Sequence, residues 1–140
     1  MARPTSFRLP EDLLDRLEQE GRAHEVSVSA LVTSMLDEGL KTRRFPGIVF
    51  RGGPAGRRAG LVGGPDVWEI VRDLRHTPGT GMRRVSTLAS EIGIPPERVR
   101  LAADFYATYP DEVDRLIDLD EQAAQRARQL IDRREQLLSQ

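Results

Sequence analysis

Cysteine is absent from this chain of 140 residues, so it can form neither a disulfide framework nor a thiolate metal site. Long hydrophobic runs are also missing, because no stretch approaches the roughly 20 apolar residues that span a bilayer. The first residues, MARPTSFRLPED, lack the apolar region of a signal peptide. These absences predict a cytoplasmic protein that needs no oxidising compartment.

Histidine is scarce, and it lacks the companions that catalysis or metal binding requires. The two histidines, His24 and His76, lie far apart in the sequence, and no cysteine accompanies them. The glycine-rich stretch RGGPAGRRAGLVGGP contains neither the GK[ST] of a P-loop nor the GxGxxG of a dinucleotide fold. We therefore expect no catalytic residues, no metal and no cofactor, and we do not expect an enzyme.

A strong charge of one sign is missing too, since 21 basic residues face 22 acidic ones. Residues 1–45 carry 7 basic and 8 acidic groups, residues 46–110 carry 9 and 6, and residues 111–140 carry 5 and 8. Lys41 is the single lysine. Bulk charge therefore does not indicate nucleic-acid binding, and any such function has to come from local arrangement.

Two amphipathic helices are predicted in residues 1–45. The stretch EDLLDRLEQEGRA, residues 11–23, has leucines at helical spacing and an acidic first turn. The stretch SVSALVTSMLDEGLKTR follows, with Ser27 as its N-cap and its apolar side chains on one face. Residues 5–9, TSFRL, alternate as in a strand, yet nothing else in this region can pair with them.

The lone strand predicts a homodimer. One strand and two short helices cannot close a core by themselves, so a second copy has to supply the missing surface. Two such strands can pair antiparallel about a twofold axis, under four helices. Phe7 and Leu9 then face the dimer core, and Ser6 and Arg8 project from the other side. The alternative is a disordered lead-in before an ordinary helical bundle.

A two-stranded ribbon of this kind fits the major groove of DNA, where arginine is the usual partner of guanine O6 and N7. Arg8 is therefore the expected base-reading residue, with Ser6 beside it. The free amides at the start of the second helix, at Ser27, Val28 and Ser29, are expected to bind phosphate.

The run TSFRLPEDLLDRLEQEGRAHEVSVSALVTSMLDEGL resembles the ribbon-helix-helix fold of the Arc, MetJ and CopG repressors, over roughly the first 44 residues. The resemblance implies a dimer on double-stranded operator DNA. It also implies three base-reading strand residues, which map onto Pro4, Ser6 and Arg8. Pro4 departs from the pattern because it offers no hydrogen bond, so Arg3 is the expected substitute and a further phosphate contact.

Residues 46–110 are predicted to form a small winged-helix-like domain. Ile48 to Phe50 and Ala59 to Val62 are expected to form a hairpin around RGGPAGRR. The stretch PDVWEIVRDLRHT is expected to form the next helix, which Pro65 and Asp66 begin. The stretch VSTLASEIGIPPERVRLAADFY has helix-turn-helix spacing, with Gly93 at the turn. Secondary DNA contacts can come from Arg57 and Arg58 of the hairpin, which can equally be solvated. They can also come from Arg98 and Arg100 of the second helix of that motif, where the mixed charge favours solvation.

The stretch from PGIVFRGGPAGRRAGLVGGPDVW to ATYPDEVD is similar to a small domain found in bacterial antitoxins of type II toxin-antitoxin modules. The shared features are the PGI start, the glycine-rich hairpin leading into a helix with a tryptophan, and the FYATYPDEVD close. The similarity implies regulatory partners, not a reaction. Trp68, the single tryptophan, is expected in the core.

Residues 111–140 are predicted to form a long helix with an almost heptad apolar seam, interrupted by Asp120 and Arg134. Such a seam requires a partner. It can be a second dimer contact, a contact with a cognate toxin, or the lid of the preceding domain. In the toxin interpretation, four arginines reach an acidic nuclease site: Arg126, Arg128, Arg133 and Arg134.

The sequence thus predicts a mainly α protein with a short β ribbon. Its expected parts are a ribbon-helix-helix dimer domain (1–45), a winged-helix-like domain (46–110) and a C-terminal helix (111–140). The expected function is sequence-specific repression, as the autoregulating antitoxin of a bacterial toxin-antitoxin module bound to the nucleoid. The alternative is a protein-interaction module or an architectural DNA-binding protein of low sequence specificity.

Overall fold

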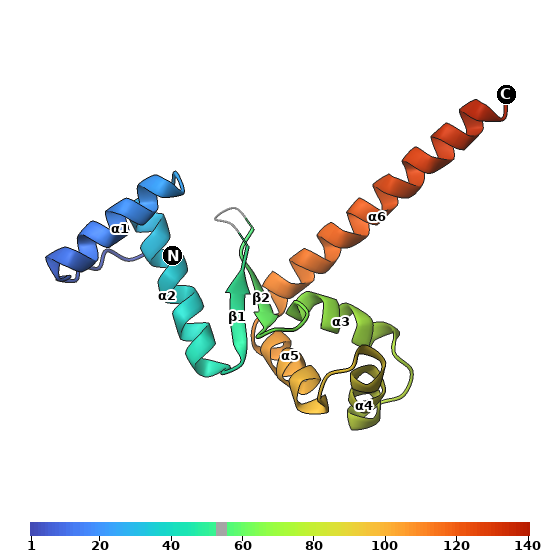
Figure 1. Cartoon of the computed structure of the whole chain (residues 1–140), viewed down its shortest axis with the longest axis horizontal. Helices are drawn as coiled ribbons and strands as arrows, with labels where there is room; N and C mark the ends of the chain where they lie inside the picture. The colour runs from blue at the N-terminus through green and yellow to red at the C-terminus, as the bar shows by residue number, and fades with distance from the viewer. Residues whose placement is uncertain (53–55) are drawn as a thin grey trace.

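The computed structural model describes residues 1–52 and 56–140 of the chain. These residues form six helices and one two-stranded antiparallel sheet, so the expected mainly α architecture with a short β element is confirmed (Figure 1). In chain order the elements are α1 (Glu11–Ala23), α2 (Val28–Arg44), β1 (Ile48–Arg51), β2 (Arg58–Leu61), α3 (Val67–His76), α4 (Gly81–Ile92), α5 (Pro96–Thr108) and α6 (Pro110–Leu138).

Helices α1 and α2 cross each other and are joined by a tight turn (Figure 1). The turn closes because the amide of Val26 donates to the carbonyl of Gly21 at 2.9 Å. Gly21 is required there, since a Cβ atom on it would lie 2.9 Å from the Val26 carbonyl oxygen. Ser27 caps α2 as expected, its side chain accepting a hydrogen bond from the amide of Ala30 at 3.1 Å.

This helix pair has almost no core of its own. Leu17 and Gly21 are its buried residues on α1, and α2 buries none. A helix pair of this size normally gains most of its stability from packing an apolar face. The pair therefore relies on surfaces outside itself.

The hairpin has the predicted position. β1 pairs antiparallel with β2 in a register that places Ile48 opposite Leu61 and Phe50 opposite Ala59. Gly60, which lies opposite Val49, leaves room for the guanidinium of Arg51, because a Cβ atom there would overlap it. The centre of the expected glycine-rich tip, residues 53–55, lies outside the described residues.

Helices α4 and α5 form the predicted helix-turn-helix. Gly93 ends α4 with a left-handed φ of 73°, a conformation that favours glycine. Leu88, Ala89 and Val99 are buried where the helices meet, as their spacing predicts. Trp68 is partly buried against the core and donates its indole N–H to Asp66 at 3.3 Å.

One core holds the hairpin and the helices that follow it. Ile48, Leu61, Val67 and Phe105 are completely or almost completely buried there, and Val113 of α6 joins the same cluster. The core therefore crosses the expected domain boundary at residue 110, and the first turns of α6 pack on the body. Beyond residue 120 every residue of the chain is exposed, and α6 projects away from the body (Figure 1).

Candidate nucleic-acid interface

Residues 1–10, which contain the expected ribbon, precede α1 and form no strand within the single chain. All ten are exposed, including the expected base-reading residues Pro4, Ser6 and Arg8 and the expected phosphate contact Arg3. Phe7 is 76% exposed, which is unusual for a phenylalanine that has no partner. The pairing of residues 5–9 with a second copy stays a prediction.

The helix pair presents further large apolar side chains to solvent. On α2, Leu36 is 57% exposed and Leu40 is 70% exposed. Leu9, Leu14 and Met35 are also exposed, but Met35 lines a cavity together with Glu38 and Arg57, on the side of α2 that faces the hairpin. We call the exposed apolar residues Phe7, Leu9, Leu14, Leu36 and Leu40 the N-terminal apolar face. Large exposed apolar side chains on a helix pair that has almost no core are typical of an interaction surface.

The N-terminus of α2, where phosphate binding is expected, begins at the Ser27 cap. The side-chain oxygen of Ser27 accepts a hydrogen bond from the amide of Ala30, and its carbonyl accepts one from the amide of Leu31. The amides of Val28 and Ser29 lie in the first turn of the helix, where an amide has no intrahelical carbonyl to donate to. The first turn of α2 carries no acidic residue that would compete with a phosphate.

The two hairpin arginines are already bound within the chain. Arg57 forms an ion pair with Glu38 of α2 at 2.7 Å and donates to the carbonyls of Gly52 and Phe50. The guanidinium of Arg58 donates from Nε to Asp66 at 2.5 Å. Contacts of either side chain with DNA would compete with these partners.

Asp66 is a structural centre that the sequence interpretation missed. Its carboxylate also accepts from Arg51, with Nη2 to Oδ1 at 2.6 Å, and its side chain is 10% exposed. Burial alone would raise the pKa of Asp66, but the hydrogen bonds from Arg51 and Arg58 outweigh burial and lower it. Asp66 and Glu69 also form the capping box of α3, a spacing that was visible in the sequence.

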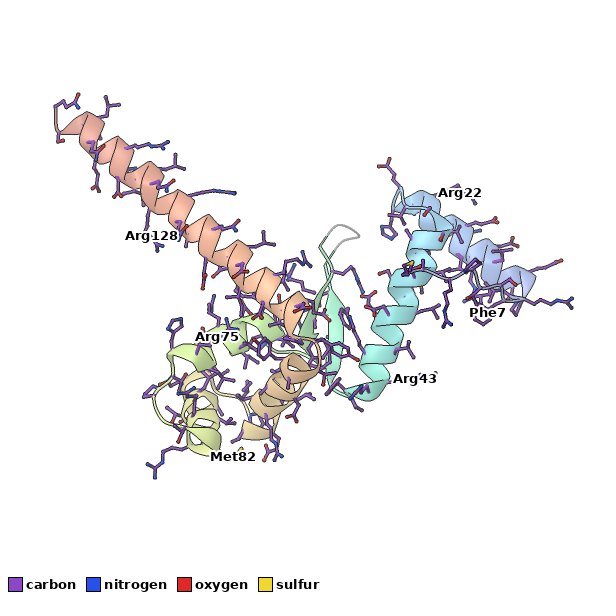
Figure 2. All side chains as sticks on the ribbon, turned by 180° about the vertical axis from the view of Figure 1, so that it is seen from behind. Phe7, Arg22, Arg43, Arg75, Met82 and Arg128 are labelled. Atoms are coloured by element: carbon purple, nitrogen blue, oxygen red, sulfur yellow. The ribbon has the colours of Figure 1, made fainter. Side chains whose placement is uncertain are left out.

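The remaining arginines named from the sequence lie apart from the N-terminal face. Arg98 donates to the carbonyl of Val62, which ties α5 to the hairpin end. Arg100 is exposed on α5. Four more are exposed on the projecting part of α6, where Figure 2 labels one of them: Arg126, Arg128, Arg133 and Arg134. The structure thus brings none of these side chains to residues 1–10.

Lys41 joins the helix pair to the body. Its ammonium lies 2.7 Å from Asp37 on α2 and 2.8 Å from Glu112 on α6, and 4.8 Å from the centre of the Tyr109 ring. Burial lowers the pKa of Lys41, but the hydrogen bonds to Asp37 and Glu112 outweigh it and raise the pKa. The sequence interpretation missed this contact, because Glu112 is distant from Lys41 in the chain.

Within the two described ranges, no helix is both long and apolar enough to cross a membrane. No group of three or more histidine, aspartate and glutamate side chains could hold a metal ion in that part of the chain either. Comparison with known proteins adds no relative, since no family model, curated protein or solved structure matches the chain.

Proposed function

We propose that this chain is a homodimeric, sequence-specific DNA-binding repressor of the cytoplasm. Residues 5–9 of two copies pair as an antiparallel ribbon that enters the major groove of a palindromic operator. The observation that supports this most is the N-terminal apolar face on a helix pair without a core. A twofold partner with the same face covers it and supplies the strand that residues 5–9 lack.

The ribbon places two polar side chains against the bases. Phe7 and Leu9 turn inward, so Ser6 and Arg8 turn outward on the period-two alternation. Arg8 then contacts guanine through O6 and N7. Phosphates are held by Arg3 and by the first amides of α2, whose turn is free of acidic side chains.

Replacement of Arg8 tests this role. We expect Arg8→Ala to weaken binding to the operator by about 1 to 3 kcal/mol, while the dimer stays intact. The matched control is Arg16→Ala, which removes the same charge from an exposed position of α1. The operator is first located by footprinting upstream of the protein's own gene, and affinity is measured by fluorescence anisotropy. Equal affinities of Arg8→Ala and the parent chain would refute base reading.

Salt dependence distinguishes specific repression from the architectural alternative. A specific repressor keeps a preference of roughly a thousandfold or more for its operator over random DNA at physiological salt. A nonspecific binder uses phosphate contacts, so it loses affinity for both sequences together as salt rises. A preference below about tenfold would favour the architectural function.

We also propose that the repressor is the autoregulating antitoxin of a toxin-antitoxin module. The similarity of residues 46–114 to antitoxin domains supports this role, as do the exposed arginines on α6. Arg126, Arg128 and Arg133 have the charge that neutralises an acidic nuclease site. Binding of the toxin encoded by a neighbouring gene should disappear when the chain is truncated at Glu121. Undiminished binding after that truncation would remove the α6 arginines from the toxin contact.

A further inference from the structure

The far part of α6 is a bare helix. Residues 121–140 are all exposed, and this segment extends about 30 Å beyond the packed part at 1.5 Å per residue. Leu130, Ile131, Leu137 and Leu138 are between 46% and 76% exposed. Figure 1 shows no other element beside this segment. A helix that is fully solvated normally carries polar side chains on all sides, so four large exposed apolar side chains indicate a surface that packs against a partner.

These side chains lie on one face. Ala124, Ile131 and Leu138 repeat every seven residues, and Ala123, Leu130 and Leu137 repeat beside them. We call these six residues, with Ala127 between the two rows, the α6 stripe. The same two rows run back to Leu116 and Ile117, which lie in the packed part of the helix. The α6 stripe therefore continues the core-facing side of α6 past the end of the body, as in one strand of a coiled coil.

We propose that the α6 stripe is covered by the α6 stripe of a second copy of this chain, packed antiparallel. The size of the side chains along the stripe supports this orientation. The half nearer the body carries alanines at 123, 124 and 127, and the far half carries leucine and isoleucine. Antiparallel pairing places the small half of each helix against the large half of the other, so the helix spacing stays even. Parallel pairing would place alanine against alanine and leave gaps.

The charge along the stripe supports the same orientation. Arg134 follows Ile131 by three residues and precedes Leu138 by four, so it lies on the stripe itself. Parallel pairing would oppose Arg134 to the same arginine of the second copy, and like charges facing each other in a seam are unfavourable. Antiparallel pairing turns Arg134 towards the alanine half, where its aliphatic stem has room and its guanidinium reaches water.

This pairing is independent of the proposed DNA binding, because it uses none of residues 1–45. If the ribbon also pairs, each dimer carries two α6 arms, and the arms join dimers into larger assemblies. The second arm then binds at a high effective concentration, which strengthens a contact that is weak for one helix. Neighbouring operator sites would be occupied cooperatively.

The mass of the full-length chain at micromolar concentration tests the association. We expect sedimentation of the parent chain to show an assembly that includes α6 pairing. In Ile131→Asp the assembly should be smaller by that one association step, because a buried charge on the α6 stripe raises the dissociation constant by more than about tenfold. Gln129→Asp is the matched control, since residue 129 lies on the opposite face of the same turn. Both positions are exposed in the single chain, so neither change disturbs the core. Equal masses of the parent chain and Ile131→Asp would overturn the proposal.

The orientation can be tested because the chain has no cysteine. Glu121→Cys and Ser139→Cys are prepared separately and treated with a short bis-maleimide. In an antiparallel pair two copies of one residue lie about 27 Å apart, 18 residues along the helix. Residue 121 of one copy then lies beside residue 139 of the other. We expect cross-linking only when the two variants are mixed.

Two outcomes would contradict this arrangement. Efficient cross-linking of either variant alone would show a parallel pair. Absence of cross-linking in every sample, with Ile131→Asp instead abolishing binding of a purified toxin, would assign the stripe to that protein. Arg8→Ala serves as an independent reference, because it should leave the cross-linking pattern unchanged even if the DNA-binding proposal fails.

Discussion

Asp66 shows how one carboxylate organises the start of the body. It accepts hydrogen bonds from Arg51 on β1, from Arg58 on β2 and from the indole of Trp68. Its side chain is 10% exposed, so its charge depends on these partners and not on water. Removing either the carboxylate or one of its guanidinium partners leaves a partly buried charge uncompensated, which lowers the free energy of unfolding.

Replacing Asp66 should therefore destabilise the body in a pH-dependent way. The pKa of Asp66 is lowered on folding, so its contribution is present above the unfolded pKa near 3.8 and disappears as pH falls below the folded pKa. We expect Asp66→Asn to lower the free energy of unfolding by about 2 kcal/mol at pH 7. The difference from the parent chain should shrink towards zero in strong acid.

Urea unfolding at pH 7 and at about pH 2 measures this difference, in the range where carboxylates are protonated. Asp104→Asn is the control, because that carboxylate is exposed on α5. The control should change stability by less than about 0.5 kcal/mol at either pH. A loss for Asp66→Asn that is the same at both pH values would show that shape, and not charge, is the contribution of Asp66.

At the residue scale the sequence predicted positions that depend on local chemistry. The N-cap role of Ser27 and the turn at Gly93 follow from backbone preferences within a few residues, and both are confirmed. Asp66 was predicted only as part of a helix start. Its arginine partners lie 8 and 15 positions away, and the contact depends on how the hairpin meets α3.

At the element scale, α2 carries two distinct faces. One faces the body through Glu38 and Lys41, which pair with Arg57 and Glu112. The other exposes Leu36 and Leu40. The helix buries none of its residues, although one face forms ion pairs and the other is apolar. We therefore expect α2 to lie at an interface. The second face is the one that a twofold partner would cover.

Leu36→Asp should therefore weaken the dimer. The change occurs twice in a symmetric interface, and each leucine contributes about 2 kcal/mol when buried, so we expect the dimer dissociation constant to rise more than about a hundredfold. Met82→Asp is the control, since Met82 is 52% exposed on α4, away from the helix pair (Figure 2). Sedimentation over a range of concentrations measures both. A normal dimer in Leu36→Asp would exclude α2 from the interface.

The periodicity of apolar residues was sufficient to predict the helices and the hairpin. The first predicted helix, residues 11–23, coincides with α1, and the predicted hairpin lies within one residue of β1 and β2. The ribbon at residues 5–9 differs, because a strand is defined by its partner. Residues 1–10 form no strand in the single chain, so the pairing of residues 5–9 stays a prediction.

At the scale of the whole molecule, α2 is fastened to the body at three places. Arg57 reaches Glu38, Lys41 reaches Glu112, and the ring of Phe45 packs edge-on against Phe105 at 5.5 Å. The helix pair and the body therefore hold one relative orientation. In the proposed dimer, the direction of each α6 would therefore follow from these contacts. The sequence did not predict this junction, because its partners are separated by tens of residues.

The contact between Lys41 and Glu112 can be measured as a coupling. Lys41→Met keeps the length of the side chain but leaves Glu112, whose side chain is 27% exposed, without its cation. We expect Lys41→Met alone to be more destabilising than Lys41→Met combined with Glu112→Gln, with a coupling energy of about 1 kcal/mol. The pKa of Lys41 is raised above its ordinary value of 10.5 on folding, so the coupling should persist at neutral pH and disappear in alkali as pH rises through the folded pKa. Unfolding curves of the four chains of this cycle give the value. Strict additivity of the two changes at pH 7 would show that the ion pair does not fasten α2 to α6.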